Sequence, residues 1–219
     1  MPDKDQATAK LRLFGASYSV YARIARLVLA ECGQAYELVE VDIFDTENLP
    51  PDYLANQPFG KIPALEHDGF RLYETDAIAH YVNEALGGGR LMPFGPRPRA
   101  RCLQVMRIID NYAYPALVWG LYVAETEEGR AEQLDAAVLA QARKVLRVLE
   151  GLAEGPYFLG EKLSLADLWA IPVFAYLRLA PSGPSLLEDC PRLQAWWDVV
   201  AVRDSIQATR FPAEEAAAA

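Results

Sequence analysis

The sequence predicts two domains, a small α/β domain followed by an all-α helical bundle. Three observations support this. Periodic segments between Leu11 and Leu86 run in the order β, α, β, α, β, β, α, a Gly- and Pro-rich break covers residues 87–98, and only helical periods follow it. The 219 residues leave room for two domains of about 100 residues each. Hydrophobic residues make up 52% of the chain, enough for a sizeable core.

The α/β domain opens with a strand, a helix and a second strand. Residues 11–14 form a short apolar strand that ends at Gly15, and residues 20–31 carry the 3.6-residue period of a helix that stops at Gly33. Residues 36–43 alternate apolar and acidic side chains, which predicts a second strand. Because a helix connects the two strands, we expect them to be parallel.

A β-hairpin and a helix complete this domain. An irregular, Pro-rich stretch over 49–60 precedes two short strands over 62–66 and 70–73. Between them, Asp68-Gly69 supplies the positive φ angles of a tight turn, so the strands pair antiparallel. A helix over 75–86 follows.

Every strong pattern after residue 98 is helical. The predicted helices cover 99–125, with a kink at Pro115, then 130–152, 164–179 and 191–201, with a short tail helix after Asp204. Neither terminus shows the hydrophobic periodicity of a helix or a strand. We therefore expect a disordered N-terminus over 1–10, the α/β domain over 11–87, a linker over 88–98, the helical domain over 99–210 and a disordered tail over 211–219.

The charge of the chain disfavours several classes of partner. Thirty acidic residues against 21 basic residues give a net charge of −9, which opposes binding to nucleic acid and to anionic membranes. The longest uncharged, largely apolar run, over 115–124, is far shorter than the roughly 20 residues of a membrane-spanning helix. Residues 1–10 lack the apolar stretch of a secretory signal. We expect a cytoplasmic protein.

The cysteines and histidines indicate no metal site and no nucleophilic triad. Cys32, Cys102 and Cys190 are odd in number and far apart, which is typical of reduced, mostly buried thiols. His67 and His80 are the two histidines of the chain, and neither stands in a zinc-binding or catalytic spacing. We expect no metal.

Two serines stand where an anion could bind. Ser17 and Ser19 follow the first strand and precede the helix over 20–31, at the carboxyl end of the sheet where α/β proteins bind ligands. A helix N-terminus attracts anions, and a serine hydroxyl can donate a hydrogen bond to one. The plainer interpretation is that Ser19 is an N-cap worth about 1 kcal/mol. Both interpretations stay open at this point.

Two further segments offer backbone and side-chain groups to a peptide-like ligand. If the Ile62-Pro63 bond is cis, the amide and carbonyl of Ile62 can pair with an extended peptide. A plain trans proline at a strand entry is the alternative. Glu74 can bind an ammonium group, and Thr75, a predicted N-cap, can help hold a carboxylate.

Three separated segments resemble one family. They are the serine turn leading into Tyr-Ala-Arg-Ile-Ala-Arg, the loop Phe-Gly-Lys-Ile-Pro-Ala-Leu, and the segment Tyr-Glu-Thr-Asp-Ala-Ile-Ala-His-Tyr-Val. Together they look like the thioredoxin-like N-terminal domain of the cytosolic glutathione S-transferase family, of a serine type and bacterial in appearance. Leu163-Ser-Leu-Ala-Asp-Leu and Pro191-Arg-Leu-Gln-Ala-Trp-Trp resemble helices of that family's all-helical domain. The resemblance covers residues 11–210.

The resemblance implies a glutathione site. It implies that Pro63 is cis, that the Ile62 backbone pairs with the cysteinyl part of glutathione, and that Lys61 faces its glycine carboxylate. Glu74 and Thr75 would bind the γ-glutamyl end.

The resemblance also implies which residue activates the thiol. Ser19 stands four residues before Arg23, the spacing of serine-type classes, so Ser19 is the expected activator and Ser17 its competitor. Tyr18 and Tyr21 are weaker candidates. No cysteine lies in this turn, which disfavours the cysteine classes.

For the remaining residues the resemblance implies a capping box and an electrophile pocket. Ser164 and Asp167 have the S-x-x-D spacing of a structural capping box. The candidate residues of the hydrophobic substrate pocket are Tyr18, Tyr112, Tyr114, Trp119 and Tyr122. These aromatics are equally compatible with ordinary core packing.

The expected function is glutathione transfer, in which the bound thiolate attacks a small hydrophobic electrophile in a detoxifying reaction by a homodimer. Peroxidase, dehalogenase, ether-cleaving or isomerase chemistry at the same site remains an alternative. So does a non-catalytic docking module, which should show a degraded ligand site. Lys61, Pro63 and Glu74 are all present, which favours an enzyme.

Overall fold

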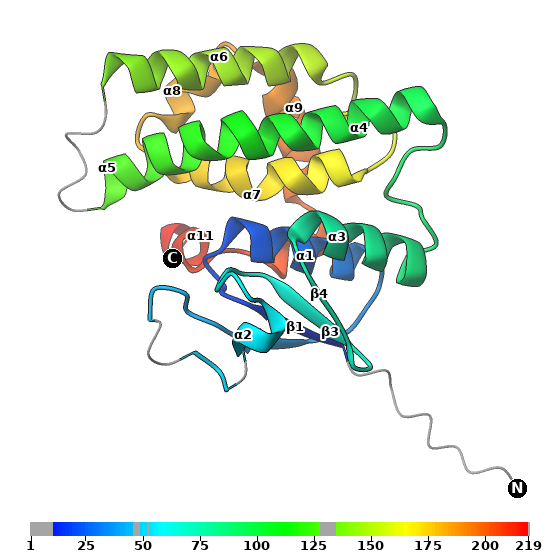
Figure 1. Cartoon of the computed structure of the whole chain (residues 1–219). Coiled ribbons are helices and arrows are strands. Elements are labelled where there is room, and N and C mark those ends of the chain that lie inside the picture. The colour runs from blue at the N-terminus through cyan, green and yellow to red at the C-terminus, as the bar shows by residue number, and fades with distance from the viewer. Residues whose placement is uncertain (1–10, 46–48, 52, 128–134, 219) are drawn as a thin grey trace, which may run out of the picture. The chain divides into compact units, whose positions relative to one another are not determined.

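The computed structural model describes residues 11–45, 49–51, 53–127 and 135–218. The chain divides into two compact units, Met1–Gly88 and Gly89–Ala219. The first contains a four-stranded sheet with helices and the second is all helical, as the sequence predicts (Figure 1). The expected disorder of residues 1–10 falls outside the described residues.

The sheet of the first unit has the strand order β2-β1-β3-β4. Its strands are β1 Leu11–Gly15, β2 Glu37–Glu40, β3 Ala64–His67 and β4 Phe70–Tyr73. The parallel pairing of β1 with β2 and the antiparallel β3-β4 hairpin are confirmed. β1 also pairs antiparallel with β3, so it is central and its carboxyl end is flanked by two strands. The turn at Asp68 (φ 50°) and Gly69 (φ 82°) has the positive φ angles that the Asp-Gly pair favours.

Strand β2 ends at Glu40, three residues earlier than the alternating pattern predicts. The Val41 amide still donates to the Gly15 carbonyl (3.0 Å), but the Asp42 carboxylate then accepts the Phe44 amide at 2.9 Å. This local bond between a side chain and the backbone takes the place of further hydrogen bonds to β1, and the chain turns away from the sheet.

The helices of the first unit are α1 Val20–Glu31, α2 Tyr53–Asn56 and α3 Thr75–Tyr81, which continues as the π-helical turn η2 Val82–Leu86. α1 and α3 pack against each other. A core cluster of Phe14, Val41, Tyr53 and Ala64 joins the sheet to α2. This cluster fixes the segments that follow β1, β2 and α2.

One long helical rod opens the second unit. It consists of α4 Pro96–Ile108, the π-helical segment η3 Ile109–Val123 and α5 Ala124–Thr126. Pro115 has no backbone N–H to donate and lies inside this π-helical segment. At the position of the predicted kink, the structure therefore has π-helical hydrogen bonding, which is wider than that of an α-helix. The rod begins at Pro96, inside the expected linker, because proline is well suited to the first turn of a helix.

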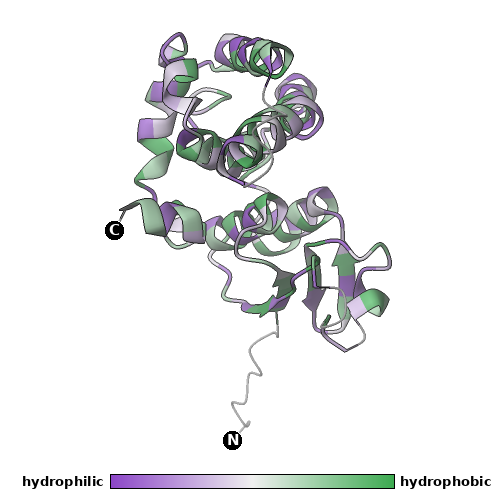
Figure 2. Ribbon diagram, turned by 90° about the vertical axis from the view of Figure 1, so that its left-hand side faces the viewer, coloured by the Kyte–Doolittle hydropathy of each residue, from purple (hydrophilic) through white to green (hydrophobic). Residues whose placement is uncertain are grey.

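Six further helices complete the described part of this unit. They are α6 Ala136–Leu152, α7 Leu165–Leu179, α8 Gly183–Leu187, α9 Pro191–Ala201, α10 Asp204–Gln207 and α11 Pro212–Ala218. The first five residues of the helix predicted over 130–152 lie outside the described residues. The Asp135 side chain caps α6 by accepting a hydrogen bond from the Val138 amide (2.9 Å). Residues 165–177 of α7 are all buried, so α7 is the central helix of this unit. In α6 the buried residues are Ala142, Val145, Leu146 and Leu149, which lie on one face. Figure 2 shows that helices of the chain carry both hydrophilic and hydrophobic residues.

The C-terminal segment is helical, so the expected disordered tail over 211–219 is wrong over 212–218. Phe211 is fully buried and stacks on Tyr176 of α7 with ring centroids 4.2 Å apart. The Glu214 carboxylate accepts the Phe211 amide at 2.8 Å, which caps the helix. A tertiary contact therefore orders a sequence without a strong period.

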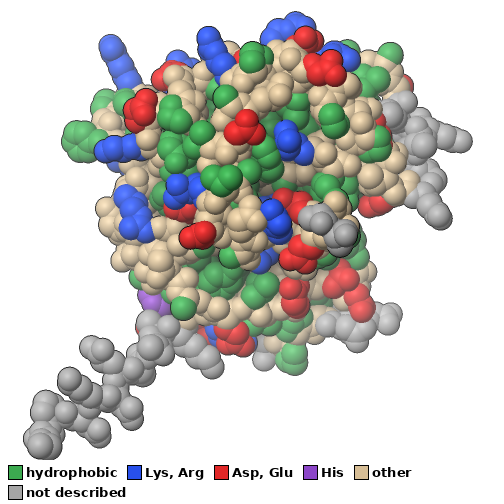
Figure 3. Space-filling model, turned by 180° about the vertical axis from the view of Figure 1, so that it is seen from behind, with side chains coloured by type: hydrophobic (Ala, Val, Ile, Leu, Met, Phe, Trp, Pro, Cys, Tyr) green, Lys and Arg blue, Asp and Glu red, His purple; other side chains and the backbone are tan. Residues whose placement is uncertain are grey.

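The surface carries charges of both signs. On the face drawn in Figure 3, Lys and Arg side chains are interspersed with Asp and Glu instead of forming a basic stripe. No helix among the described residues combines the length and the apolar character needed to cross a membrane. Cys32, Cys102 and Cys190 are buried and form no disulfide with one another.

Candidate active site

The turn between β1 and α1 carries the two candidate serines. Gly15 ends β1 where a Cβ atom would lie 2.8 Å from the Ala22 Cβ, so only glycine allows this close approach of strand and helix. The Ser19 amide donates to the Ala16 carbonyl (3.0 Å) and closes the turn. Ser19 is the N-cap of α1, and its Oγ accepts a hydrogen bond from the Ala22 amide (3.2 Å).

Ser17 and Tyr18 are held by two acidic residues, one at the end of β2 and one just after it. The Ser17 amide donates to Glu40 Oε2 at 3.3 Å. The Tyr18 hydroxyl donates to Asp42 Oδ1 at 2.8 Å. Burial, together with Asp42, raises the pKa of Tyr18 to about 12, while the Phe44 amide and the Tyr18 hydroxyl lower the pKa of Asp42. Tyr18 is thus a neutral phenol whose hydroxyl hydrogen is already engaged in a hydrogen bond to Asp42.

The loop before β3 presents a backbone edge. The Ile62-Pro63 bond is cis, and Pro63 is buried at the entry to β3. Within the described part of the chain, the backbone N–H and C=O of Ile62 have no hydrogen-bond partner. The Tyr53 side chain is buried in the core, and its hydroxyl donates a hydrogen bond to the Lys61 carbonyl. This bond anchors the loop to the core.

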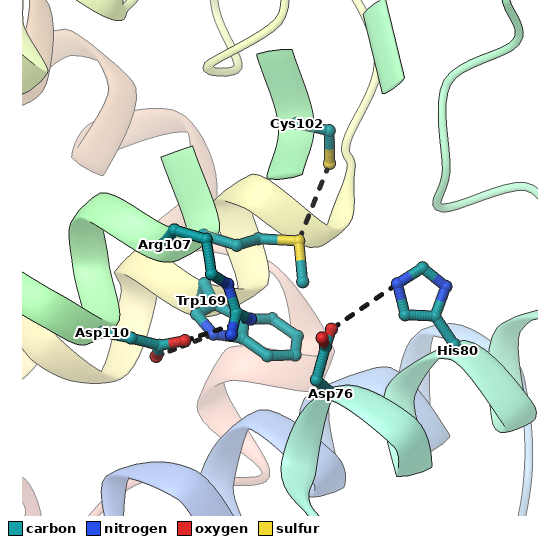
Figure 4. Close-up of polar contacts among 7 residues, drawn as sticks. Asp76, His80, Cys102, Arg107, Asp110 and Trp169 are labelled. Carbon is teal, nitrogen blue, oxygen red and sulfur yellow. Dashed lines mark hydrogen bonds and ion pairs between the residues drawn. The ribbon is translucent and has the colours of Figure 1, made fainter. Parts of the chain in front are cut away.

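Glu74 occupies the sharp junction between β4 and α3. Its φ of 69° and ψ of 118° are unusual for a residue with a side chain, and such backbone strain is concentrated at functional sites. Glu74 is the N-cap and Thr75 the first helical residue, so the prediction that Thr75 is the N-cap is wrong by one position. The Glu74 side chain makes no capping bond and is exposed. Next in the helix, Asp76 pairs with His80 at 3.5 Å (Figure 4).

The five candidate pocket aromatics have different surroundings, and one of them lies in the first unit and four in the second. Tyr18 stacks on Phe44 in the first unit. Tyr112 is 54% exposed and lines a groove between η3 and α6. Tyr114 is hydrogen-bonded to the Trp119 side chain, and burial raises its pKa. Tyr122 packs against Tyr176, with ring centroids 4.5 Å apart.

Ser164 and Asp167 form a reciprocal capping box at the start of α7. Asp167 is fully buried, and its carboxylate accepts from the Ser164 amide, the Ser164 hydroxyl and the Phe158 amide at 2.8 Å each, and from Trp196 Nε1 at 3.0 Å. Burial raises the pKa of Asp167, and the hydrogen bonds oppose this shift. The box therefore connects α7 to α9 and has a structural role.

A second carboxylate organises the rod. Asp110, near the start of η3, accepts from Trp169 Nε1 at 3.0 Å and pairs with Arg107 at 3.1 Å (Figure 4). Through its bond to Trp169, this carboxylate joins η3 to the central helix α7. Among the described residues, no group of three or more His, Cys, Asp or Glu side chains has an arrangement suited to a metal ion.

Sequence reasoning missed Tyr53, Asp42 and Phe44. Tyr53 reads as an ordinary core aromatic, since its partner carbonyl is eight residues away and the bond depends on the fold. Asp42 reads as the polar position of a strand, although an Asp two residues before Phe44 is a signal for a local turn.

The family comparisons agree with this geometry. Residues 18–85 match the family described as "Glutathione S-transferase, N-terminal domain", and residues 112–204 match "Glutathione S-transferase, C-terminal domain". "Glutathione S-transferase 4" from Zea mays is 31% identical over 208 residues and covers 90% of each chain. "Glutathione S-transferase 3" from Zea mays is 32% identical over 212 residues and covers 92% of this chain and 93% of the relative.

Solved structures give the same answer. "Glutathione S-transferase III in apo form" superimposes with a TM-score of 0.75 at 32% identity, covering 92% of this chain and 95% of that one. A glutathione S-transferase from Pseudomonas fluorescens has a TM-score of 0.75 at 28% identity, covering 89% and 96%. The Zea mays relatives are plant proteins, so the bacterial appearance expected from the sequence is not supported as a distinguishing feature. From its two domains, its cis-proline loop and these relatives, the chain belongs to the glutathione S-transferase family and is a glutathione transferase.

Proposed function

We propose that Ser19 is the residue that keeps the glutathione thiol ionised, which makes the protein a serine-type transferase. The observation that carries this proposal is the direction of the Ser19 hydrogen bond. Its Oγ accepts from the Ala22 amide, so the hydroxyl hydrogen is left to donate to another acceptor. The N-terminus of α1 adds a partial positive charge beside it.

Ser17 and Tyr18 are less suited to this role. The Ser17 amide is bound to Glu40, and a carboxylate beside the reaction centre disfavours a thiolate. The Tyr18 hydroxyl already donates to Asp42, and its pKa of about 12 makes it a poor proton donor. Of the three residues, Ser19 caps α1, whereas Ser17 and Tyr18 are hydrogen-bonded to carboxylates.

Glutathione binds along the backbone edge beside Pro63. The two backbone groups of Ile62 pair with the cysteinyl residue in the manner of an added strand. Lys61 is exposed and supplies a positive charge for the glycine carboxylate. The exposed Glu74 carboxylate binds the γ-glutamyl ammonium group, and Thr75 lies at the helix N-terminus that faces its carboxylate.

The chemistry requires a modest free-energy change. A free thiol has a pKa of about 8.5, so most of it is protonated at neutral pH. Each unit of pKa lowering corresponds to about 1.36 kcal/mol of preferential stabilisation of the anion. One hydroxyl donor and a helix end together supply about 2–3 kcal/mol, enough to ionise the thiol at neutral pH. Serine acts as a hydrogen-bond donor and takes part in no covalent step.

The thiolate then attacks a small hydrophobic electrophile. Tyr114 and Trp119, which are joined by a hydrogen bond, are the better candidates for its pocket, since Tyr122 is packed on Tyr176. An electrophile panel of an aryl halide, an epoxide and an organic hydroperoxide separates conjugation from peroxidase chemistry. Conjugation adds the whole mass of glutathione to the epoxide, and to the aryl halide the mass of glutathione less that of the hydrogen halide released. Peroxidase chemistry gives instead an alcohol, water and oxidised glutathione.

We also propose that the protein is a cytoplasmic homodimer with a detoxifying role. The exposed aromatic and aliphatic side chains of the groove that Tyr112 and Val148 line are a surface that a second copy can cover. Light scattering at micromolar concentration measures the mass. A monomeric mass contradicts the dimer and leaves the proposal for Ser19 unaffected.

The decisive experiment compares Ser19→Ala, Ser19→Thr and Ser17→Ala. Loss of one hydrogen bond to an anion costs about 1.5–3 kcal/mol, so Ser19→Ala should lower kcat at neutral pH about 10- to 100-fold and change KM for glutathione little. The loss should shrink at high pH, where the thiol ionises unaided. Ser19→Thr keeps a hydroxyl and a capping oxygen and is the matched control. If Ser17→Ala gives this loss and Ser19→Ala does not, Ser19 is not the activator.

A further inference from the structure

Three contacts tie the β1–α1 turn to the end of β2 and the residues that follow it. The Ser17 amide donates to Glu40 (3.3 Å) and the Tyr18 hydroxyl donates to Asp42 (2.8 Å). The Tyr18 ring stacks on Phe44, with centroids 5.9 Å apart and an interplanar angle of 29°. Asp42 Oδ1 also accepts the Phe44 amide at 2.9 Å, which fixes the carboxylate. The three contacts between the two segments are made by Ser17 and Tyr18, which stand within two residues of Ser19.

We propose that Tyr18 and Asp42 form a latch that positions the Ser19 hydroxyl for the thiol. This inference rests on the proposed role of Ser19 and deepens it. Tyr18 and Asp42 touch neither glutathione nor the electrophile in this proposal, so both are positioning residues. The latch consists of one side-chain hydrogen bond that joins two segments 24 residues apart.

The geometry of the turn explains why a latch is needed. The Ser19 amide is bonded to the Ala16 carbonyl, and Ser19 Oγ is bonded to the Ala22 amide. Ser17 and Tyr18 are the two residues of the turn between these fixed points. Tyr18 is held at its hydroxyl and at its ring, and these contacts restrict the residue that directly precedes Ser19. A displacement of about 1 Å at a reacting group can cost up to about 100-fold in rate.

The charge of Asp42 argues for a geometric role over an electrostatic one. A carboxylate near a thiolate raises the thiol pKa and opposes catalysis. Asp42 is exposed to solvent, which screens its charge, and its oxygen is used by two donors. Tyr18 stays protonated well above neutral pH, because its pKa is raised to about 12, so the bond persists throughout the working range.

The test uses Tyr18→Phe, Asp42→Ala, Asp42→Asn and the double variant Tyr18→Phe/Asp42→Ala. The readouts are kcat, KM for glutathione and the pKa of the bound thiol, followed by thiolate absorbance in the ultraviolet. Tyr157→Phe is the matched control, because it removes a hydroxyl that accepts from Arg203 in the helical unit.

A latch gives a specific pattern. Tyr18→Phe and Asp42→Ala should each raise the pKa of the bound thiol and lower kcat at neutral pH about 3- to 10-fold, with KM nearly unchanged. The double variant should be no worse than the worse single variant, since both changes break one bond. Asp42→Asn should stay within about twofold of the unmodified protein, because the asparagine carbonyl can accept the same two hydrogen bonds.

Two results overturn the latch. The first is an unchanged thiol pKa and kcat in Tyr18→Phe and Asp42→Ala, with a loss of thermal stability alone. The second is a fall of the thiol pKa in Asp42→Asn as well as Asp42→Ala, which would make the charge of Asp42 the active property. Ser19→Ala is measured in parallel. If it leaves the thiol pKa unchanged, the proposed function of Ser19 fails and the latch fails with it. If it raises the pKa while Tyr18→Phe does not, the latch alone fails.

Discussion

Replacing Asp167 by alanine should lower the free energy of unfolding of the helical unit by about 3–5 kcal/mol. The carboxylate accepts four hydrogen bonds of 2.8–3.0 Å in a site closed to solvent. Alanine leaves three donors that cannot turn away, the Phe158 and Ser164 amides and Trp196 Nε1. Each unsatisfied buried donor costs about 1–3 kcal/mol, and backbone relaxation keeps the total near the lower end of that sum.

Urea unfolding followed by tryptophan fluorescence measures this loss. All four tryptophans of the chain lie in the helical unit, so their emission reports on that unit. Ser164→Ala is the reference variant, because it removes one hydroxyl and should cost only about 1 kcal/mol. Asp167→Asn keeps the shape but turns one acceptor into a donor, so it should fall close to Asp167→Ala. If Asp167→Ala costs no more than Ser164→Ala, the three donors find other partners and the reasoning is wrong.

Two further predictions concern the first unit. Tyr53→Phe releases the Lys61 carbonyl and should raise KM for glutathione about 2- to 5-fold, the effect of losing about 0.5–1 kcal/mol, whereas Tyr36→Phe should leave KM unchanged. An ultraviolet titration should show Tyr18 and Tyr53 ionising near pH 12, above the ordinary value of about 10. Because both pKa values are raised on folding, the stability that they contribute is complete below the ordinary pKa and is lost as the pH rises through about 12. Ionisation of all 11 tyrosines in a single step near pH 10 would contradict this.

The elements that sequence reasoning predicted are those fixed by local pattern and connection. The helical period fixes α1, and the crossover through α1 makes β1 and β2 parallel. The Asp68-Gly69 turn defines the β3-β4 hairpin by the φ angles it favours. Ser164 and Asp167 formed a recognisable pair because a capping box has a fixed spacing.

The features that it missed depend on contacts between distant residues or on local competition. β2 is short because the Asp42 side chain competes for the backbone. The tail is helical because the Phe211 ring stacks on Tyr176, a contact that no local sequence pattern indicates. The Tyr53 bond to Lys61 requires the core to bring α2 under the loop. The candidate serines could thus be identified from the sequence, whereas the orientation of their side chains depends on the fold.

The anchoring of Phe211 determines where this chain tolerates engineering at its carboxyl terminus. Because the ring is enclosed while residues 215–217 are exposed, a purification tag fused after Ala219 leaves the buried contact in place. A stop codon placed ahead of position 211 would instead empty a space the size of a phenyl group beside Tyr176. Shortened expression versions should therefore end after the final helix.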